Sequence, residues 1–84
     1  MLEEVRTILG ESLQLGARAE QLQPQTQLLG NLPELDSLAV VNVITSIEER
    51  YGVVIDDDEL SADIFENLGS LTAFVEKKVN GQSA

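Results

Sequence analysis

The chain of 84 residues contains no cysteine, no histidine and no tryptophan. Without cysteine it has no disulfide and no thiolate ligand for a metal. Without histidine it lacks the usual general base for activating a serine, and it lacks a common zinc ligand. The remaining candidates for such a base, Lys77 and Lys78, belong to the far end of the sequence. A small serine hydrolase is therefore set aside, and we expect a protein that is not an enzyme.

Basic residues are scarce as well, with 5 Lys and Arg against 15 Asp and Glu and a net charge of −10. Nucleic acids and anionic membrane surfaces are bound mainly through Lys and Arg. Neither is expected as a partner of this chain. A strongly acidic domain suits partner proteins that carry basic patches.

Long hydrophobic runs are also missing, since no segment approaches the roughly 20 apolar residues of a membrane span. The first residues, MLEEVR, are acidic where a signal peptide would be basic. We expect a monomeric cytoplasmic protein with no membrane insertion. The apolar content of 43% is typical of a folded domain. We predict a single domain over residues 1–79 and a frayed tail over residues 80–84.

Apolar residues recur at helical spacing over residues 2–15, which predicts a first helix that Gly16 ends. Residues 16–36 are rich in Gln and interrupted by Pro24, Gly30 and Pro33. This composition predicts a long loop, with a turn of helix near residues 17–21 and leucines that attach the loop to the core.

Residues 37–51 repeat the helical spacing, and Gly52 ends the run. The many β-branched residues make a strand a competing interpretation, but the length favours a helix. The expected inward positions are Leu38, Val41, Ile44, Ile47, Glu48 and Tyr51, widened by Val40 and Val43.

Residues 53–55 are expected to form an extended connector without a strand partner. Ser61 is positioned to cap a short helix over residues 62–66. Ser70 is positioned to cap a last helix that ends near Val79 and has Lys77 and Lys78 in its final turn. The predicted fold is all-α: a small bundle of three main helices plus one short helix, with a long loop after the first.

Ser37 has two interpretations. As a helix N-cap, its hydroxyl would accept a hydrogen bond from a backbone amide, although Asp36 could do this equally well. Alternatively, the hydroxyl is the functional atom. A helix N-terminus favours negative charge, so a phosphate ester on this serine would be well placed there.

The stretch LDSLAVVNVITSIEERYGV resembles the second-helix region of acyl carrier proteins, in which an Asp-Ser-Leu triplet opens the helix. Here the triplet is Asp36-Ser37-Leu38. The resemblance extends over most of the chain and includes Leu28-Leu29-Gly30 in the loop and the helix end at residues 48–52. It implies the small helical bundle of that family.

The resemblance also implies a cofactor, 4′-phosphopantetheine, esterified to the Ser37 hydroxyl and carrying acyl groups as thioesters. Asp36 would be recognised by the phosphopantetheinyl transferase, which attaches this group. Leu38 would anchor the helix start or face partner proteins beside the phosphopantetheine arm. The partners would be that transferase and the enzymes that load and transfer acyl groups. Interior residues could shelter the acyl chain, although simple core packing explains each of them: Val5, Leu9, Leu29, Val41, Ile44, Ile47, Phe65, Leu68 and Phe74.

The sequence departs from the pattern of carriers in fatty acid synthesis, which have acidic residues just after the triplet. Ala39 and Asn42 occupy those positions here, with an additional apolar residue at Val40. We expect an exposed, weakly charged face near the helix start and hypothesise a specialised carrier. Together with DDDELS and FENLGSLTAFV, the triplet region resembles the carriers associated with bacterial exosortase and exopolysaccharide loci. The expected partner-binding residues are Ala39, Val40, Asn42, Glu48 and Glu49.

The acidic run of residues 56–59 is expected to be a solvated face rather than a metal site. An EF-hand fails because Ser61 stands at the glycine position and Asn67 at the final Glu position.

Two alternative functions stay open. One is a peptidyl or aminoacyl carrier, which would share the modified serine. The other is an unmodified acidic interaction module, in which Ser37 could become Ala without loss of function.

Overall fold

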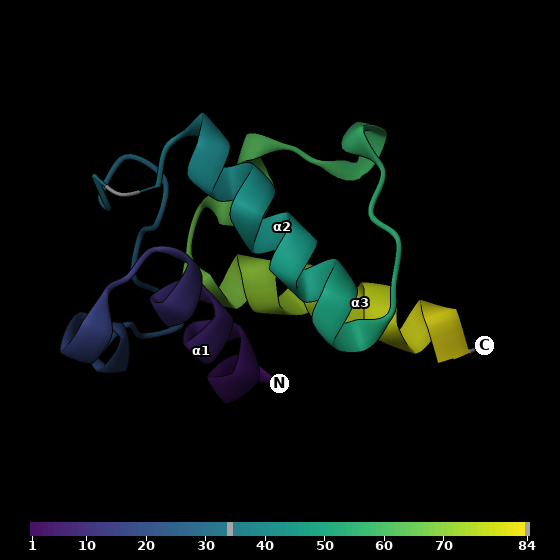
Figure 1. The fold of residues 1–84 in the computed structure, drawn as a ribbon, viewed down its shortest axis with the longest axis horizontal. Coiled ribbons are helices and arrows are strands. Elements are labelled where there is room, and N and C mark those ends of the chain that lie inside the picture. Colours follow the sequence, from purple (N-terminus) through teal and green to yellow (C-terminus); the bar gives the residue numbers. More distant parts are fainter. Residues whose placement is uncertain (34, 84) are drawn as a thin grey trace.

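The computed structural model describes residues 1–33 and 35–83. Three α-helices and three short 3-10 helices (η) follow one another: α1 (Leu2–Ser12), η1 (Gly16–Gln21), α2 (Ser37–Tyr51), η2 (Asp57–Glu59), η3 (Ala62–Phe65) and α3 (Leu68–Ser83). In Figure 1, α2 runs diagonally across the molecule in front of α3, with α1 beside it. α1 packs against both α2 and α3. Within the described residues no element is a strand, so the predicted all-α bundle is confirmed.

The first helix ends earlier than predicted, at Ser12 rather than Leu15. Its end is closed by two backbone bonds, from the Leu15 amide to the Gly10 carbonyl at 2.9 Å and from Gln14 to Glu11 at 3.4 Å. Gln14 adopts the left-handed conformation with φ of 55°. This is a Schellman-type cap, in which glycine is the usual residue. Gly16 also has a positive φ, but it begins η1 rather than ending the helix.

The loop between α1 and α2 is attached to the core as expected. Its Leu22, Leu28, Leu32 and Leu35 are buried, whereas Leu29 is 38% exposed. The predicted helical turn near residues 17–21 is confirmed as η1. Backbone bonds of 3.0 Å join the amides of Leu28 and Leu29 to carbonyls of Glu66 and Phe65. The loop therefore lies against η3, on one side of the start of α2.

The second helix has the predicted bounds, Ser37–Tyr51, and Gly52 caps it in the left-handed conformation. The predicted inward positions Val43, Ile44 and Ile47 are confirmed, but those at Leu38 and Val41 are wrong. Leu38 is 70% exposed and Val41 is 57% exposed. The inward residues are Ala39, Val43, Ile44 and Ile47. The start of the helix is apolar almost all round, so its periodicity did not determine which side faces the core.

The connector after α2 is held by two carboxylates. A Glu48 oxygen accepts a hydrogen bond from the Ile55 amide at 2.8 Å. A Glu59 oxygen accepts one from the Asp56 amide at 2.9 Å. The other Glu59 oxygen is 2.7 Å from the Lys78 ammonium on α3. The Glu48 contact attaches the extended residues 53–56 to α2. The Glu59 contact with Lys78 attaches η2 to α3.

The last helix begins and ends at different residues from those predicted. The Ser70 amide donates to the Asn67 side-chain oxygen at 2.7 Å, and the Asn67 amide donates to the Ser70 hydroxyl at 3.1 Å. Asn67 is thus the N-cap, with Ser70 as its reciprocal partner inside the first turn. The helix continues to Ser83, so Lys77 and Lys78 are not in its final turn. Fraying of residues 80–84 stays a prediction, and Ala84 lies outside the described residues. The short helix is η3, over Ala62–Phe65.

We expect Gln14→Gly to stabilise the protein by about 1 kcal/mol, because glycine adopts a positive φ without a Cβ penalty. In a domain of this size the melting temperature should rise by about 4–8 °C, measured by circular dichroism. Gln25→Gly is the matched control, since Gln25 is exposed and has a negative φ. An equal fall in melting temperature for Gln14→Gly and Gln25→Gly would contradict the assignment of Gln14 to a left-handed cap position.

We also expect a pH-dependent contribution from Glu59. Its hydrogen bond with Lys78, followed by that with the Asp56 amide, lowers the pKa of Glu59 below its ordinary value of 4.5. A lowered folded-state pKa adds stability above the unfolded pKa, and this stability is lost as the pH falls. Urea denaturation from about pH 6 to about pH 3 should therefore show a larger loss for wild type than for Glu59→Gln. Glu76→Gln on the exposed side of α3 should keep the wild-type profile.

Candidate functional site

The start of α2 is capped by Asp36. Its side-chain oxygen accepts a hydrogen bond of 2.8 Å from the Ala39 amide, and its backbone is extended, with φ of −104° and ψ of −174°. The Asp36 carbonyl accepts the first intrahelical bond, from the Val40 amide at 2.9 Å. The sequence offered both Asp36 and Ser37 as the N-cap of this helix. In the structure the N-cap is Asp36.

Ser37 is the first residue of the helix, and its side chain is exposed. Within the described part of the chain its hydroxyl forms no hydrogen bond. The first amides of a helix have no intrahelical acceptor, and the helix dipole favours negative charge there. A phosphodiester on this hydroxyl would lie at the positive end of α2 without displacing an internal contact. The residues present therefore fit a 4′-phosphopantetheine group.

The exposed surface of α2 after Ser37 is uncharged and partly apolar. Leu38 and Val41 are exposed, and Asn42 and Thr45 extend the same surface along the helix. The first exposed carboxylate after Asp36 on this helix is Glu49. The predicted weakly charged surface at the start of α2 is therefore present and includes the predicted Asn42, but Leu38 and Val41 replace Ala39 and Val40 in it.

The expected partner-binding residues fall into different environments. Ala39 is 8% exposed, so its prediction as a surface residue is wrong, because it is on the side of α2 that packs on the core. Val40 is half-buried and packs against the core. Asn42 and Glu49 are exposed. Glu48 is half-buried, with its carboxylate bound to the connector.

A surface hollow of about 290 Å³ lies between α2, the loop and η3. Val40, one turn after Ser37 on α2, lines it together with Leu29 and Phe65. The other lining residues are Leu60, Ser61 and Ala62, none of which was predicted to belong to a site. Their chemistry is too ordinary to indicate a site before folding places them together.

The residues expected to line an acyl-binding interior mostly form the close-packed core. Val5, Leu9, Ile47 and Leu68 have no exposed surface, and Ile44 and Phe65 are also buried. Leu29 and Val41 are exposed, which contradicts an interior position for them. Phe74 is partly buried against the core.

Among the side chains that the structure describes, no group of three or more acidic, His or Cys residues could hold a metal ion. The side chain of Asp57 lies outside the described features. No helix of the described residues is long and apolar enough to cross a membrane.

The chain is similar to known carrier proteins in family, sequence and structure. The family model for the phosphopantetheine attachment site matches residues 3–75. The acyl carrier protein of Helicobacter pylori is 32% identical over 76 residues, which cover 90% of this chain and 91% of the relative. That of Nitratidesulfovibrio vulgaris is 39% identical over 57 residues, which cover 68% of this chain and 71% of the relative.

The structure is similar to the solution NMR structure of a holo acyl carrier protein from Nitrosomonas europaea. The TM-score is 0.87 and the identity 58%, with 94% of this chain and 95% of that chain covered. The family match spans most of the chain and includes the helix start at Asp36-Ser37-Leu38. The chain therefore belongs to the acyl carrier protein family, as a carrier rather than an enzyme, with 4′-phosphopantetheine as its prosthetic group.

Proposed function

We propose that Ser37 is the attachment residue and that the protein presents acyl groups to partner enzymes from this position. The observation that carries the proposal is the division of roles at the start of α2. Asp36 caps the helix, and the exposed Ser37 hydroxyl is left without a hydrogen bond among the described residues. When bound, the phosphopantetheine group supplies the terminal thiol that carries the acyl thioester. The chain raises the effective concentration of that cargo at the partner enzyme.

The neighbours of Ser37 have separate roles in this proposal. Asp36 holds the helix start in place through the Ala39 amide and is itself recognised by the phosphopantetheinyl transferase. Leu38, at 70% exposure, faces partners beside the arm instead of anchoring the helix to the core. The hollow lined by Leu29, Val40 and Phe65 would shelter an apolar cargo, since Val40 lies one helical turn after Ser37.

We propose further that the protein is a specialised carrier. Its partners are a phosphopantetheinyl transferase and acyl-handling enzymes, as in the family generally. The finer assignment rests on the uncharged surface of Leu38, Val41 and Asn42, which offers no carboxylate to the basic patch of a fatty acid synthesis enzyme. We propose that this specialised carrier is of the type associated with bacterial exosortase and exopolysaccharide loci. A cytoplasmic location and a monomeric state stay predictions.

The two alternatives differ in their use of Ser37. A peptidyl or aminoacyl carrier would use the same hydroxyl with another cargo. An unmodified interaction module would function without it. The exposed, unbonded hydroxyl favours the carrier interpretations, because an interaction module has no need of this arrangement.

We expect wild-type protein to gain one phosphopantetheinyl group on incubation with a promiscuous transferase, coenzyme A and Mg²⁺. Ser37→Ala should gain none and should keep the wild-type free energy of unfolding within about 0.5 kcal/mol, since the hydroxyl has no internal partner. Intact-mass spectrometry measures the first result and thermal denaturation the second. Ser61→Ala, which alters another exposed serine before a short helix, is the control and should be modified normally. Modification of Ser37→Ala would overturn the assignment.

We expect the holo protein to be a poor substrate for the elongation enzymes of fatty acid synthesis. Asn42→Glu should improve its use by about threefold at low salt, because it adds an exposed carboxylate to the uncharged surface. The control, Asn80→Glu, adds the same charge on α3 and should change little. Turnover is measured against a housekeeping carrier at several NaCl concentrations. Equal turnover of wild type and the housekeeping carrier would contradict the specialised assignment.

A further inference from the structure

The hollow near Ser37 has three walls, which belong to different parts of the chain. Val40 on α2 forms one wall, and Leu29 of the loop forms the second. The third wall is the stretch from Leu60 to Ala62, together with Phe65 of η3. The walls are almost entirely apolar, so the access of an apolar cargo to the hollow depends on how firmly each wall is held.

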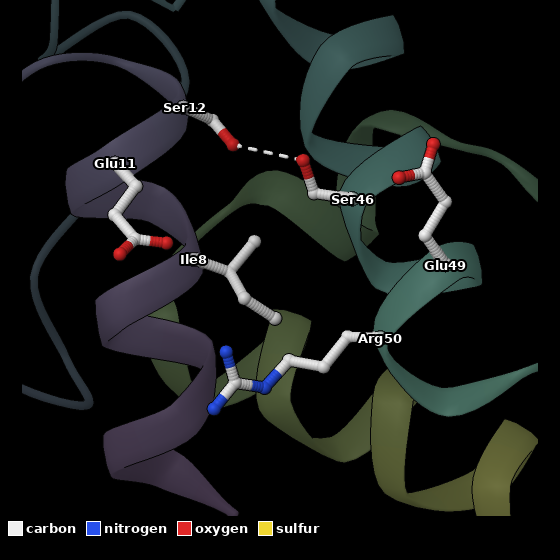
Figure 2. A pocket seen from close by; sticks show the side chains of 6 residues that line it. All are labelled: Ile8, Glu11, Ser12, Ser46, Glu49 and Arg50. Atoms are coloured by element: carbon white, nitrogen blue, oxygen red, sulfur yellow. Dashed lines mark hydrogen bonds between the residues drawn. The ribbon is translucent and has the colours of Figure 1, made fainter.

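The first two walls are held by several contacts. α2 packs against α1, and the hydroxyls of Ser12 and Ser46, 3.3 Å apart, join the two helices across the surface groove between them (Figure 2). Backbone hydrogen bonds between 2.7 and 3.3 Å join the loop to residues 65–69, and their amide donors are Leu28, Leu29, Leu68 and Gly69. The loop and the chain from residue 65 onward are therefore held as one unit.

The third wall is held by fewer contacts. Figure 1 shows this part of the chain, in green, leaving the end of α2 and returning along the molecule to η3. Among the described residues, the backbone–backbone hydrogen bonds of residues 56–62 reach no farther than η3. Leu60 is half-buried against the core. Besides that packing, the ion pair of Glu59 with Lys78 joins this stretch to α3.

The Glu59 carboxylate is bonded on two sides. Its two oxygens lie 2.7 and 2.9 Å from the Lys78 ammonium, and one of them also accepts a hydrogen bond from the Asp56 amide at 2.9 Å. The Glu59 side chain is 34% exposed and the Lys78 side chain 22%. A pair that is partly shielded from water is weakened less by salt than a fully exposed pair. The pair thus connects α3 to the residue that directly precedes Leu60 in the wall of the hollow.

We propose that the Glu59–Lys78 pair is a latch that holds the stretch from Leu60 to Ala62 against the hollow and so controls the access of cargo. Breaking the pair frees Glu59 from α3, and the wall that follows it moves away from Val40. A partly exposed ion pair is weak enough for this wall to open as a local fluctuation while the helices stay packed. The latch belongs to the unmodified chain, whereas its effect on cargo rests on the proposed function of Ser37.

The first test uses the absence of cysteine from the chain. Val40→Cys places a single thiol on the α2 wall of the hollow, and Ser37→Ala in the same protein removes the attachment hydroxyl. The rate of labelling with N-ethylmaleimide, an uncharged reagent, then reports how often the hollow opens. Ser46→Cys, made in place of Val40→Cys, puts the thiol at a half-buried position in the groove between α1 and α2 and is the reference site.

We expect Glu59→Gln and Lys78→Gln each to accelerate labelling of Val40→Cys by about twofold to fivefold, because each removes the ion pair. Labelling of Ser46→Cys should not change. The double variant should label no faster than either single variant, since the interaction is already lost. Lys77→Gln is the matched control, because Lys77 is exposed and is not bonded to Glu59, and it should keep the wild-type rate.

Two results would overturn the latch. One is an unchanged labelling rate of Val40→Cys in both single variants, or an equal acceleration at Ser46→Cys. The other is acceleration by one of Glu59→Gln and Lys78→Gln and slowing by the other. These two substitutions remove opposite charges, so opposite effects would show a response to net charge instead of the loss of a pair.

The effect on cargo is tested on the holo protein, loaded by the transferase from octanoyl-coenzyme A or acetyl-coenzyme A. We expect Lys78→Gln to accelerate cleavage of the octanoyl thioester by hydroxylamine by about twofold to fivefold. Cleavage of the acetyl thioester should not change, because an acetyl group has too little apolar surface to be held in the hollow.

Unchanged cleavage of the octanoyl thioester, beside faster labelling of Val40→Cys, would contradict the control of cargo by the latch. A wild-type protein that accepts no phosphopantetheine would instead overturn the attachment at Ser37. The labelling experiment, which is made on Ser37→Ala, would still decide whether the latch exists.

Discussion

The hydrogen bond from the Ala39 amide to the Asp36 carboxylate is the contact on which the functional end of the molecule depends. It determines that α2 begins at Ser37 and not one residue later. With Asp36 as the cap, the Ser37 hydroxyl is not required for helix formation and remains exposed at the positive end of the helix dipole. The same start brings Ala39 to the buried side and leaves Leu38 and Val41 in solvent.

The arrangement gives one helix two kinds of surface. From Ser37 to Thr45 the exposed residues of α2 are uncharged, although the chain has 15 acidic residues and 5 basic ones. Farther along, Glu49 and Arg50 share a groove with α1. Contacts to the uncharged start of α2 depend mainly on the burial of apolar surface. Contacts to the charged residues Glu49 and Arg50 weaken as the salt concentration rises.

Much of the site could be predicted because the motif is local. The triplet Asp36-Ser37-Leu38 sits directly before an apolar helical run, and its meaning does not depend on distant contacts. The rotation of α2 could not be predicted, because apolar residues surround the first two turns of that helix. The groove could not be predicted either. Glu11, Ser12, Ser46 and Glu49 are ordinary surface residues until packing places two separate helices side by side.

By itself the sequence determined the fold class, the bounds of α2 and the position of the serine, since each follows from periodicity, glycine placement or a contiguous motif. Tertiary structure decided which side of the first turns of α2 is buried and where α1 and α3 end. Gln14 ends α1 in a conformation that usually calls for glycine, and Asn67 begins α3 through a reciprocal bond with Ser70. The physical reason is that helix rotation and the end of α1 depend on burying apolar side chains in one shared core, to which Leu13 and Leu15 belong, and this burial outweighs the local preference against a positive φ at Gln14.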